Sequence, residues 1–134
     1  MGEYRLLAAA AAVAVIGVFG AQALNAQQPA FKRTVLQQHD ISTPGKQAVT
    51  ALAEIPAGIA VGKHTHPGEE VGYVLEGGLV LEIDGQPAQT LKAGDAFFVP
   101  AGMVHDGKNT GATTTKVLAN YIVEKGKPVA TPVK

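Results

Sequence analysis

Residues 58–77 read GIAVGKHTHPGEEVGYVLEG, a run that places metal-ligating side chains around a strand-breaking Pro-Gly pair. On a strand, residues i and i+2 point to the same face, so His64 and His66 can share one ion. The turn that follows lets Glu70 bring a carboxylate back to the same neighbourhood. Imidazole and carboxylate ligands together suit Fe, Mn, Ni, Cu or Zn. These residues alone leave open a surface strand that carries two solvated imidazole rings.

A second run, residues 94–109, reads GDAFFVPAGMVHDGKN and supplies a third histidine, His105. Strand alternation predicts that one of Phe97 and Phe98 points inward and the other outward. The fourth histidine, His39, lies outside both runs and is expected at the surface.

The remaining sequence is typical of short strands separated by Gly- and Pro-containing turns. Residues 79–84 show the clearest alternation, with Leu79, Leu81 and Ile83 on one face. Asp84-Gly85 then fits a tight hairpin turn, because glycine tolerates the positive φ that such turns require. Residues 117–123 are the last strand that the pattern predicts, and no helical periodicity of useful length follows residue 23.

These patterns predict a single all-β domain over residues 31–124, a sandwich or a barrel. Residues 24–30 are polar and proline-containing, and we expect a short leader there. Residues 125–134 contain lysine and proline and are expected to form a C-terminal tail.

The first 23 residues resemble a Sec-type signal peptide. A short basic start precedes residues 6–20, which carry no charged side chain, and Ala21-Gln22-Ala23 offers small residues at a cleavage site. Ala26 is a second possible cleavage point. We therefore expect an exported protein, periplasmic or secreted, with no stable membrane anchor after cleavage. An uncleaved anchor is the alternative.

Charge excludes some partners. The chain carries 11 basic and 11 acidic residues, and no segment concentrates lysine or arginine, so nucleic acid is not an expected partner. The chain has no cysteine and therefore no disulfide, but a domain of this size can bury a core without one.

The spacing of both runs resembles the two signature motifs of the cupin superfamily. Residues 58–77 place Gly58, His64, His66, Glu70 and Gly77 at the intervals of the first motif. Residues 94–109 do the same for the second, with the defining positions Gly94, Pro100, Gly102, His105 and Asn109. The short connection between them, residues 78–93, is of the kind found in small bacterial single-domain cupins.

The resemblance implies a double-stranded β-helix, or jelly-roll, barrel. It also implies that His64, His66, Glu70 and His105 bind one divalent transition-metal ion, whose identity the sequence leaves open. Asn109 is expected to be a turn or strand-end residue. Spacing selects Glu70 over Glu69, which should point the other way.

Candidate catalytic residues are fewer. Tyr73 could donate a proton or a hydrogen bond to a metal-bound substrate, and packing in the barrel wall is its alternative role. Glu69 could assist as an acid or base, and a plain surface charge is its alternative. Met103 could shape the mouth of the pocket or simply pack in the core.

The resemblance favours a metal-dependent enzyme, dioxygenase-like or of related chemistry, that acts on a small organic substrate. A non-catalytic protein that captures a small ligand through the metal outside the cytoplasm is the alternative, and a structural ion is a third. Cupins of this size commonly pair through their outer strands, so we also expect a homodimer that buries a sheet edge and uses strands near either end of the folded region.

Overall fold

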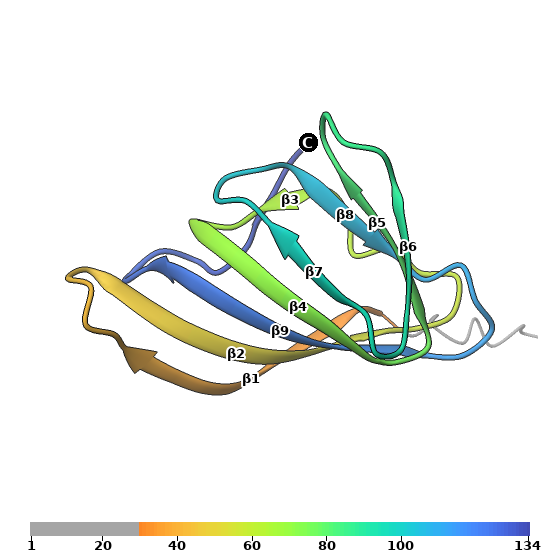
Figure 1. Cartoon of the computed structure of the whole chain (residues 1–134), viewed down its shortest axis with the longest axis horizontal. Coiled ribbons are helices and arrows are strands. Elements are labelled where there is room, and N and C mark those ends of the chain that lie inside the picture. The colour runs from red at the N-terminus through yellow and green to blue at the C-terminus, as the bar shows by residue number, and fades with distance from the viewer. Residues whose placement is uncertain (1–29) are drawn as a thin grey trace, which may run out of the picture.

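Two five-stranded sheets form the part of the chain that the computed structural model describes, residues 30–134. The expected signal peptide, residues 1–23, lies outside the described residues. No helix occurs within residues 30–134, so none there is long and apolar enough to cross a membrane. The two sheets lie as two layers, which confirms the predicted all-β jelly-roll architecture (Figure 1).

The first sheet contains the longest strands, and all of its neighbouring strands are antiparallel. In spatial order its strands are β1 (Lys32–Asp40), β2 (Lys46–Ile55), β9 (Thr115–Glu124), β4 (Gly68–Glu76) and β7 (Ala96–Val99). The second sheet has shorter strands. In spatial order these are β10 (Thr131–Pro132), β3 (His64–Thr65), β8 (His105–Lys108), β5 (Gly78–Ile83) and β6 (Gln89–Lys92).

The core lies between the sheets because side chains alternate along the strands. Strand β2 alternates buried and half-buried residues along its whole length, and β9 does so along most of its own. The predicted inward face of β5 is confirmed, since Leu79, Leu81 and Ile83 are all buried. The two phenylalanines of β7 divide as predicted, with Phe97 buried and Phe98 half exposed.

Two glycines on β4 allow the strand to lie close to its neighbours. A Cβ atom at Gly68 would lie 1.9 Å from the carbonyl oxygen of Ile122 on β9. A Cβ atom at Gly72 would lie 2.0 Å from the ring of Phe97 on β7. Both contacts are far inside van der Waals distance, so a side chain at Gly68 would clash with the backbone of β9, and one at Gly72 would have to displace the ring of Phe97.

The turns also follow the sequence prediction. Gly85 has a φ of 79° in the turn after β5, as expected for the Asp-Gly pair. Asn109 is a buried turn residue: its amide donates to the carbonyls of Ile55 and Thr113, and its side-chain oxygen accepts from the amide of Gly111. It therefore ties β8 to the end of β2 and makes no contact with the histidines.

Candidate metal centre

The four predicted ligands come together from both sheets. His64 lies on β3 and His105 on β8, where they are directly paired in register. His66 follows β3 immediately, and Glu70 enters from β4 in the opposite sheet. All four side chains are buried, with exposed fractions between 2% and 6%. Burial of this many titratable groups in one place requires that they satisfy one another or a bound cation.

The distances within this cluster are short. The candidate ligand atoms of His64, His66 and His105 all lie within 4.8 Å of one another. Oε2 of Glu70 lies 3.0 Å from Nε2 of His66 and 3.2 Å from Nε2 of His105. One ion can therefore contact all three imidazoles after small side-chain adjustments, with the carboxylate alongside.

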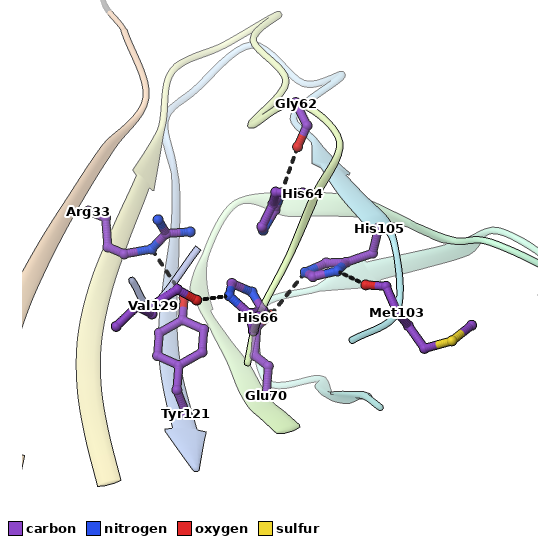
Figure 2. Close-up of polar contacts among 9 residues, drawn as sticks. All are labelled: Arg33, Gly62, His64, His66, Glu70, Met103, His105, Tyr121 and Val129. Carbon is purple, nitrogen blue, oxygen red and sulfur yellow. Dashed lines mark hydrogen bonds and ion pairs between the residues drawn. The ribbon is translucent and has the colours of Figure 1, made fainter. Parts of the chain in front are cut away.

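Each imidazole is oriented by a backbone carbonyl (Figure 2). Nδ1 of His64 donates to the carbonyl of Gly62 at 2.7 Å, and Nδ1 of His105 donates to that of Met103 at 2.9 Å. Nδ1 of His66 donates to the carbonyl of Val129 at 2.5 Å. Because Nδ1 of each ring is bonded to a backbone carbonyl, every Nε2 faces the site, and that of His66 lies at hydrogen-bonding distance from the carboxylate of Glu70.

This arrangement turns three Nε2 atoms toward a carboxylate, and a proton or a metal ion must lie at each close nitrogen–oxygen contact. Nε2 of His105 is buried and makes no hydrogen bond within residues 30–134. Three imidazole nitrogens with one carboxylate oxygen form a donor set that suits a divalent transition metal. The residues present therefore fit the predicted ion.

The electrostatics of the site favour the metal-binding forms of His64 and Glu70. Burial, reinforced by the nearby His105 and His66, lowers the pKa of His64 from 6.5 to about 4, against the raising effect of its bond to Gly62. Burial alone would raise the pKa of Glu70, but its contacts with His105 and His66 outweigh this and lower the pKa to about 2. Both groups thus remain in their metal-binding forms well below neutral pH.

An aspartate next to His105 supports the loop that orients His64. Oδ1 of the buried Asp106 accepts the amide of Gly62 at 2.9 Å, and the carbonyl of Gly62 in turn accepts Nδ1 of His64. Asp106, the residue after the ligand His105, therefore helps to orient the ring of a second ligand, His64.

Two residues that the sequence analysis did not single out lie beside the cluster. The ring of Tyr121 on β9 packs on His66, with ring centroids 4.6 Å apart, and its hydroxyl accepts Nε of Arg33 at 3.2 Å. Burial, with the charge of Glu70, raises the pKa of Tyr121 to about 12. The alternation of the predicted strand over residues 117–123 could have placed Tyr121 inward, but no comparable signal marked Arg33.

A small cavity adjoins the ligands and continues the barrel interior. Its volume is about 40 Å³, and its polar lining comes from His64, Glu70, His105, Arg33 and Tyr121. The rest of the lining is mainly apolar, including Phe31, Ile55, Leu81 and Phe97. A larger depression of about 410 Å³ shares Phe31, Arg33, Val61 and His64 with this cavity. These four residues therefore stand between the inner cavity and its mouth.

The structure does not bring the two predicted catalytic residues to this site. Tyr73 is 44% exposed, and together with Glu69 it projects from the face of β4 opposite to Glu70. Strand alternation explains this outcome, because residues one and three positions from an inward residue must point outward. Tyr121 is the tyrosine that lies beside the ligands.

The expected C-terminal tail is also corrected. Residues 131–132 form β10, which pairs with β3, and the carbonyl of Val129 accepts the hydrogen bond from His66. This end of the chain therefore belongs to the folded domain and to the surroundings of the site. Met103 is half buried against the core, and its backbone carbonyl orients His105. His39 is exposed on β1, as expected.

Comparisons with known proteins agree with this architecture. The chain is 38% identical over 79 residues to the oxalate-binding protein of Thermotoga maritima, a match that covers 58% of this chain and 64% of that one. It is 31% identical over 111 residues to the transcriptional regulator PuuR of Escherichia coli, which covers 71% of this chain and 60% of the regulator.

Among solved structures, the dimethylsulfoniopropionate (DMSP) lyase DddQ of Ruegeria pomeroyi has a similar fold. The TM-score is 0.65 at 21% identity, and the match covers 78% of this chain and 52% of the lyase. The chain thus spans less than two thirds of the length of each of these three proteins.

The family itself is shown by sequence. The family model for the cupin domain matches residues 51–121, which is more than half of the chain and includes His64, His66, Glu70 and His105. The chain belongs to the cupin family.

Proposed function

We propose that this protein binds one divalent transition-metal ion through His64, His66, His105 and Glu70 and acts with it on a small organic molecule. One observation carries the proposal. All three imidazoles use Nδ1 for a backbone carbonyl, which leaves three Nε2 atoms and a carboxylate facing one another in a buried site. Nε2 of His105 in particular makes no hydrogen bond within residues 30–134.

The cavity beside the ligands supports an ion with open positions rather than a closed structural site. A structural zinc site commonly has four protein ligands, often cysteines, and is closed to solvent. Here a cavity of about 40 Å³ reaches His64, Glu70 and His105. When bound, the ion supplies Lewis-acid or redox chemistry to a molecule in that cavity.

The protein side chains supply positioning and exclude water. The apolar walls formed by Ile55, Leu81 and Phe97 remove water from the neighbourhood of the ligands. Tyr121, whose pKa is about 12, remains protonated at neutral pH and holds Arg33 at the edge of the cavity. The reaction class that we propose is metal-dependent and dioxygenase-like or related to it.

A non-catalytic role in ligand capture is the second candidate, and one observation favours it. Within residues 30–134, the carboxylates and imidazoles that line the inner cavity are those of the ligands His64, Glu70 and His105, so none is left over there as a free acid–base group facing a bound molecule. One relative is an oxalate-binding protein, whose name describes binding, whereas the structural neighbour DddQ is a lyase. We propose export as the setting for either role, as the N-terminal sequence suggests.

Elemental analysis tests the metal site. Protein purified without added metal and then loaded with Mn²⁺, Fe²⁺ or Zn²⁺ should hold about one ion per chain. The double variant His64→Ala, His66→Ala should hold none, while His39→Ala should match the wild type. Equal metal in the double variant and the wild type would overturn the proposal.

Turnover then separates the two candidates. Oxygen consumption and substrate loss are measured on the metal-loaded protein with a panel of enols and small organic acids. An enzyme is supported if the wild type turns over a substrate and the Glu70→Gln variant does not, while the melting profile of the variant matches that of the wild type. Saturable ligand binding without turnover by any loaded form supports the capture role.

A further inference from the structure

Arg33 occupies an unusual position for a guanidinium group. It lies near the start of β1, where the strand is half buried, and it lines both the inner cavity and the outer depression. Figure 2 shows its terminal nitrogens on the side that faces His64. In the described part of the chain, Arg33 is also the one basic side chain, apart from the histidines, that lines the inner cavity.

Aromatic neighbours hold this guanidinium in place. Its central carbon lies 5.1 Å from the ring centroid of Phe31 and 5.8 Å from that of Tyr121. Its Nε donates to the hydroxyl of Tyr121 at 3.2 Å. These contacts fix the plane of the group, and they use only one of its three nitrogens.

The two terminal nitrogens of Arg33 have no protein partner within residues 30–134. Six lysines in this part of the chain form ion pairs with carboxylates, whereas Arg33 has no carboxylate within 4.0 Å. A half-buried cation without a counter-ion is costly, so an anion that enters from solvent is stabilised there. The planar group presents its free N–H donors in a geometry that matches a carboxylate.

The positive charge of a bound metal ion would also favour an anionic ligand. A divalent ion and Arg33 together carry three positive charges, and Glu70 is the one carboxylate among residues 30–134 that lines the inner cavity. The loaded site is therefore strongly positive and favours an anionic ligand over a neutral one of the same shape. The inner cavity, of about 40 Å³, has room for a group of a few heavy atoms beside the metal ligands.

We infer that the ligand of this site is a small carboxylate, and that Arg33 is the residue that selects it by binding a carboxylate oxygen while the molecule faces the metal. This inference rests on the proposed function, since it requires a metal-loaded site. It assigns a specificity-determining role to a residue outside both histidine-containing runs.

Calorimetry on the Mn²⁺-loaded protein tests this assignment with a matched pair of probes. Glycolate and glycolamide have nearly the same shape and differ in charge. Wild type should bind glycolate more tightly than glycolamide, and Arg33→Gln should weaken glycolate binding by about tenfold or more. Arg33→Gln should leave the affinity for glycolamide and for Mn²⁺ close to that of the wild type.

Two further variants separate direct binding from a packing effect. Arg33→Lys retains the charge but loses the planar pair of donors, so its glycolate affinity should fall between those of wild type and Arg33→Gln. Tyr121→Phe removes the hydroxyl that accepts Nε but leaves the guanidinium, and its loss should be smaller than that of Arg33→Gln.

The outcomes are distinguishable. A wild-type protein that binds no Mn²⁺ contradicts the proposed function itself. Normal Mn²⁺ binding with equal affinity for glycolate and glycolamide overturns the assignment of a carboxylate ligand. Normal Mn²⁺ binding with unchanged glycolate affinity in Arg33→Gln overturns the role of Arg33.

Discussion

The carbonyl oxygen of Val129 accepts a hydrogen bond from Nδ1 of His66 at 2.5 Å, across 63 positions of the chain. This bond makes the C-terminal segment part of the environment of the metal centre. It fixes the ring orientation and the tautomer of His66, and such partners of metal-binding histidines contribute to metal affinity.

Removal of residues 127–134 should therefore weaken metal binding although no ligand is deleted. We expect the affinity to fall by about 10- to 100-fold, the range typical for loss of a partner that orients a ligand. Competition with a chromophoric chelator measures the effect. Deletion of Lys134 alone is the matched control and should retain wild-type affinity, because the carbonyl of Val129 and the pairing of β10 remain. Unchanged affinity in the longer truncation would contradict the prediction.

Metal addition should stabilise the folded protein, because an ion that binds only the folded state shifts the unfolding equilibrium. At a free metal concentration 100 times Kd, the free energy of unfolding should rise by about 2.7 kcal/mol. Thermal melts with and without Zn²⁺ or Mn²⁺ measure this gain. His105→Ala should lose most of it and His39→Ala should keep it, since His39 is exposed on β1. The idea fails if His105→Ala shows the full gain.

The metal-free protein should lose stability in acid over two pH ranges. The pKa of His64 is about 4 when folded and 6.5 ordinarily, so the unfolded state binds the extra proton and stability falls from about pH 6.5 to 4. Glu70, with a folded pKa of about 2 against 4.5, adds stability that is present above pH 4.5 and lost as the pH falls toward 2. Urea unfolding at a series of pH values in the presence of a chelator measures both.

Substitution of His64 separates these two ranges. His64→Gln should flatten the decline between about pH 6.5 and 4 while the decline below pH 4.5 persists. A decline in His64→Gln as steep as that of the wild type would assign the upper range to another group.

The homodimer remains a prediction, and the structure offers a place for it away from the terminal strands, on the outer face of the first sheet. Val71 on β4 and Phe98 on β7 are cross-strand partners and are 47% and 52% exposed. The neighbouring Tyr73 and Leu75 are also more than 40% exposed, and β7 is the edge strand of this sheet. Exposed apolar surface of this kind is typical of contacts between chains.

We expect a second copy of this chain to cover that face. Light scattering at micromolar concentration should give a dimer mass for the wild type and a monomer mass for Val71→Glu combined with Phe98→Glu. Metal content should be unchanged in the variant, because both side chains point away from the ligands. A monomeric wild type would contradict the prediction.

The sequence predicted the structure best where inward and outward side chains alternate along a strand. The inward face of β5 and the division of Phe97 from Phe98 follow from strand alternation alone. The meeting of His64 with His105 depends on pairing between strands about 40 residues apart, which periodicity cannot predict. That part of the site came from the resemblance to cupin motifs.

Two parts of the site escaped prediction for physical reasons. Strand β10 has two residues, one of them proline, so it carries no alternation from which to infer a strand. Its position depends on pairing with β3 and not on local propensity. Arg33 lies on a strand that is exposed along most of its length, and its inward role depends on aromatic neighbours that a linear pattern does not reveal.

The missing side chain at residue 72 has a consequence for how this protein can diversify. The ring of Phe97 is part of the cavity wall and lies directly against Gly72, a residue that does not itself line the cavity. Any substitution there must displace the ring and so remodel the space next to the ligands. A single codon on β4 can thus retune which molecules fit while every metal ligand and Arg33 stay the same, which makes it a natural starting point for directed evolution.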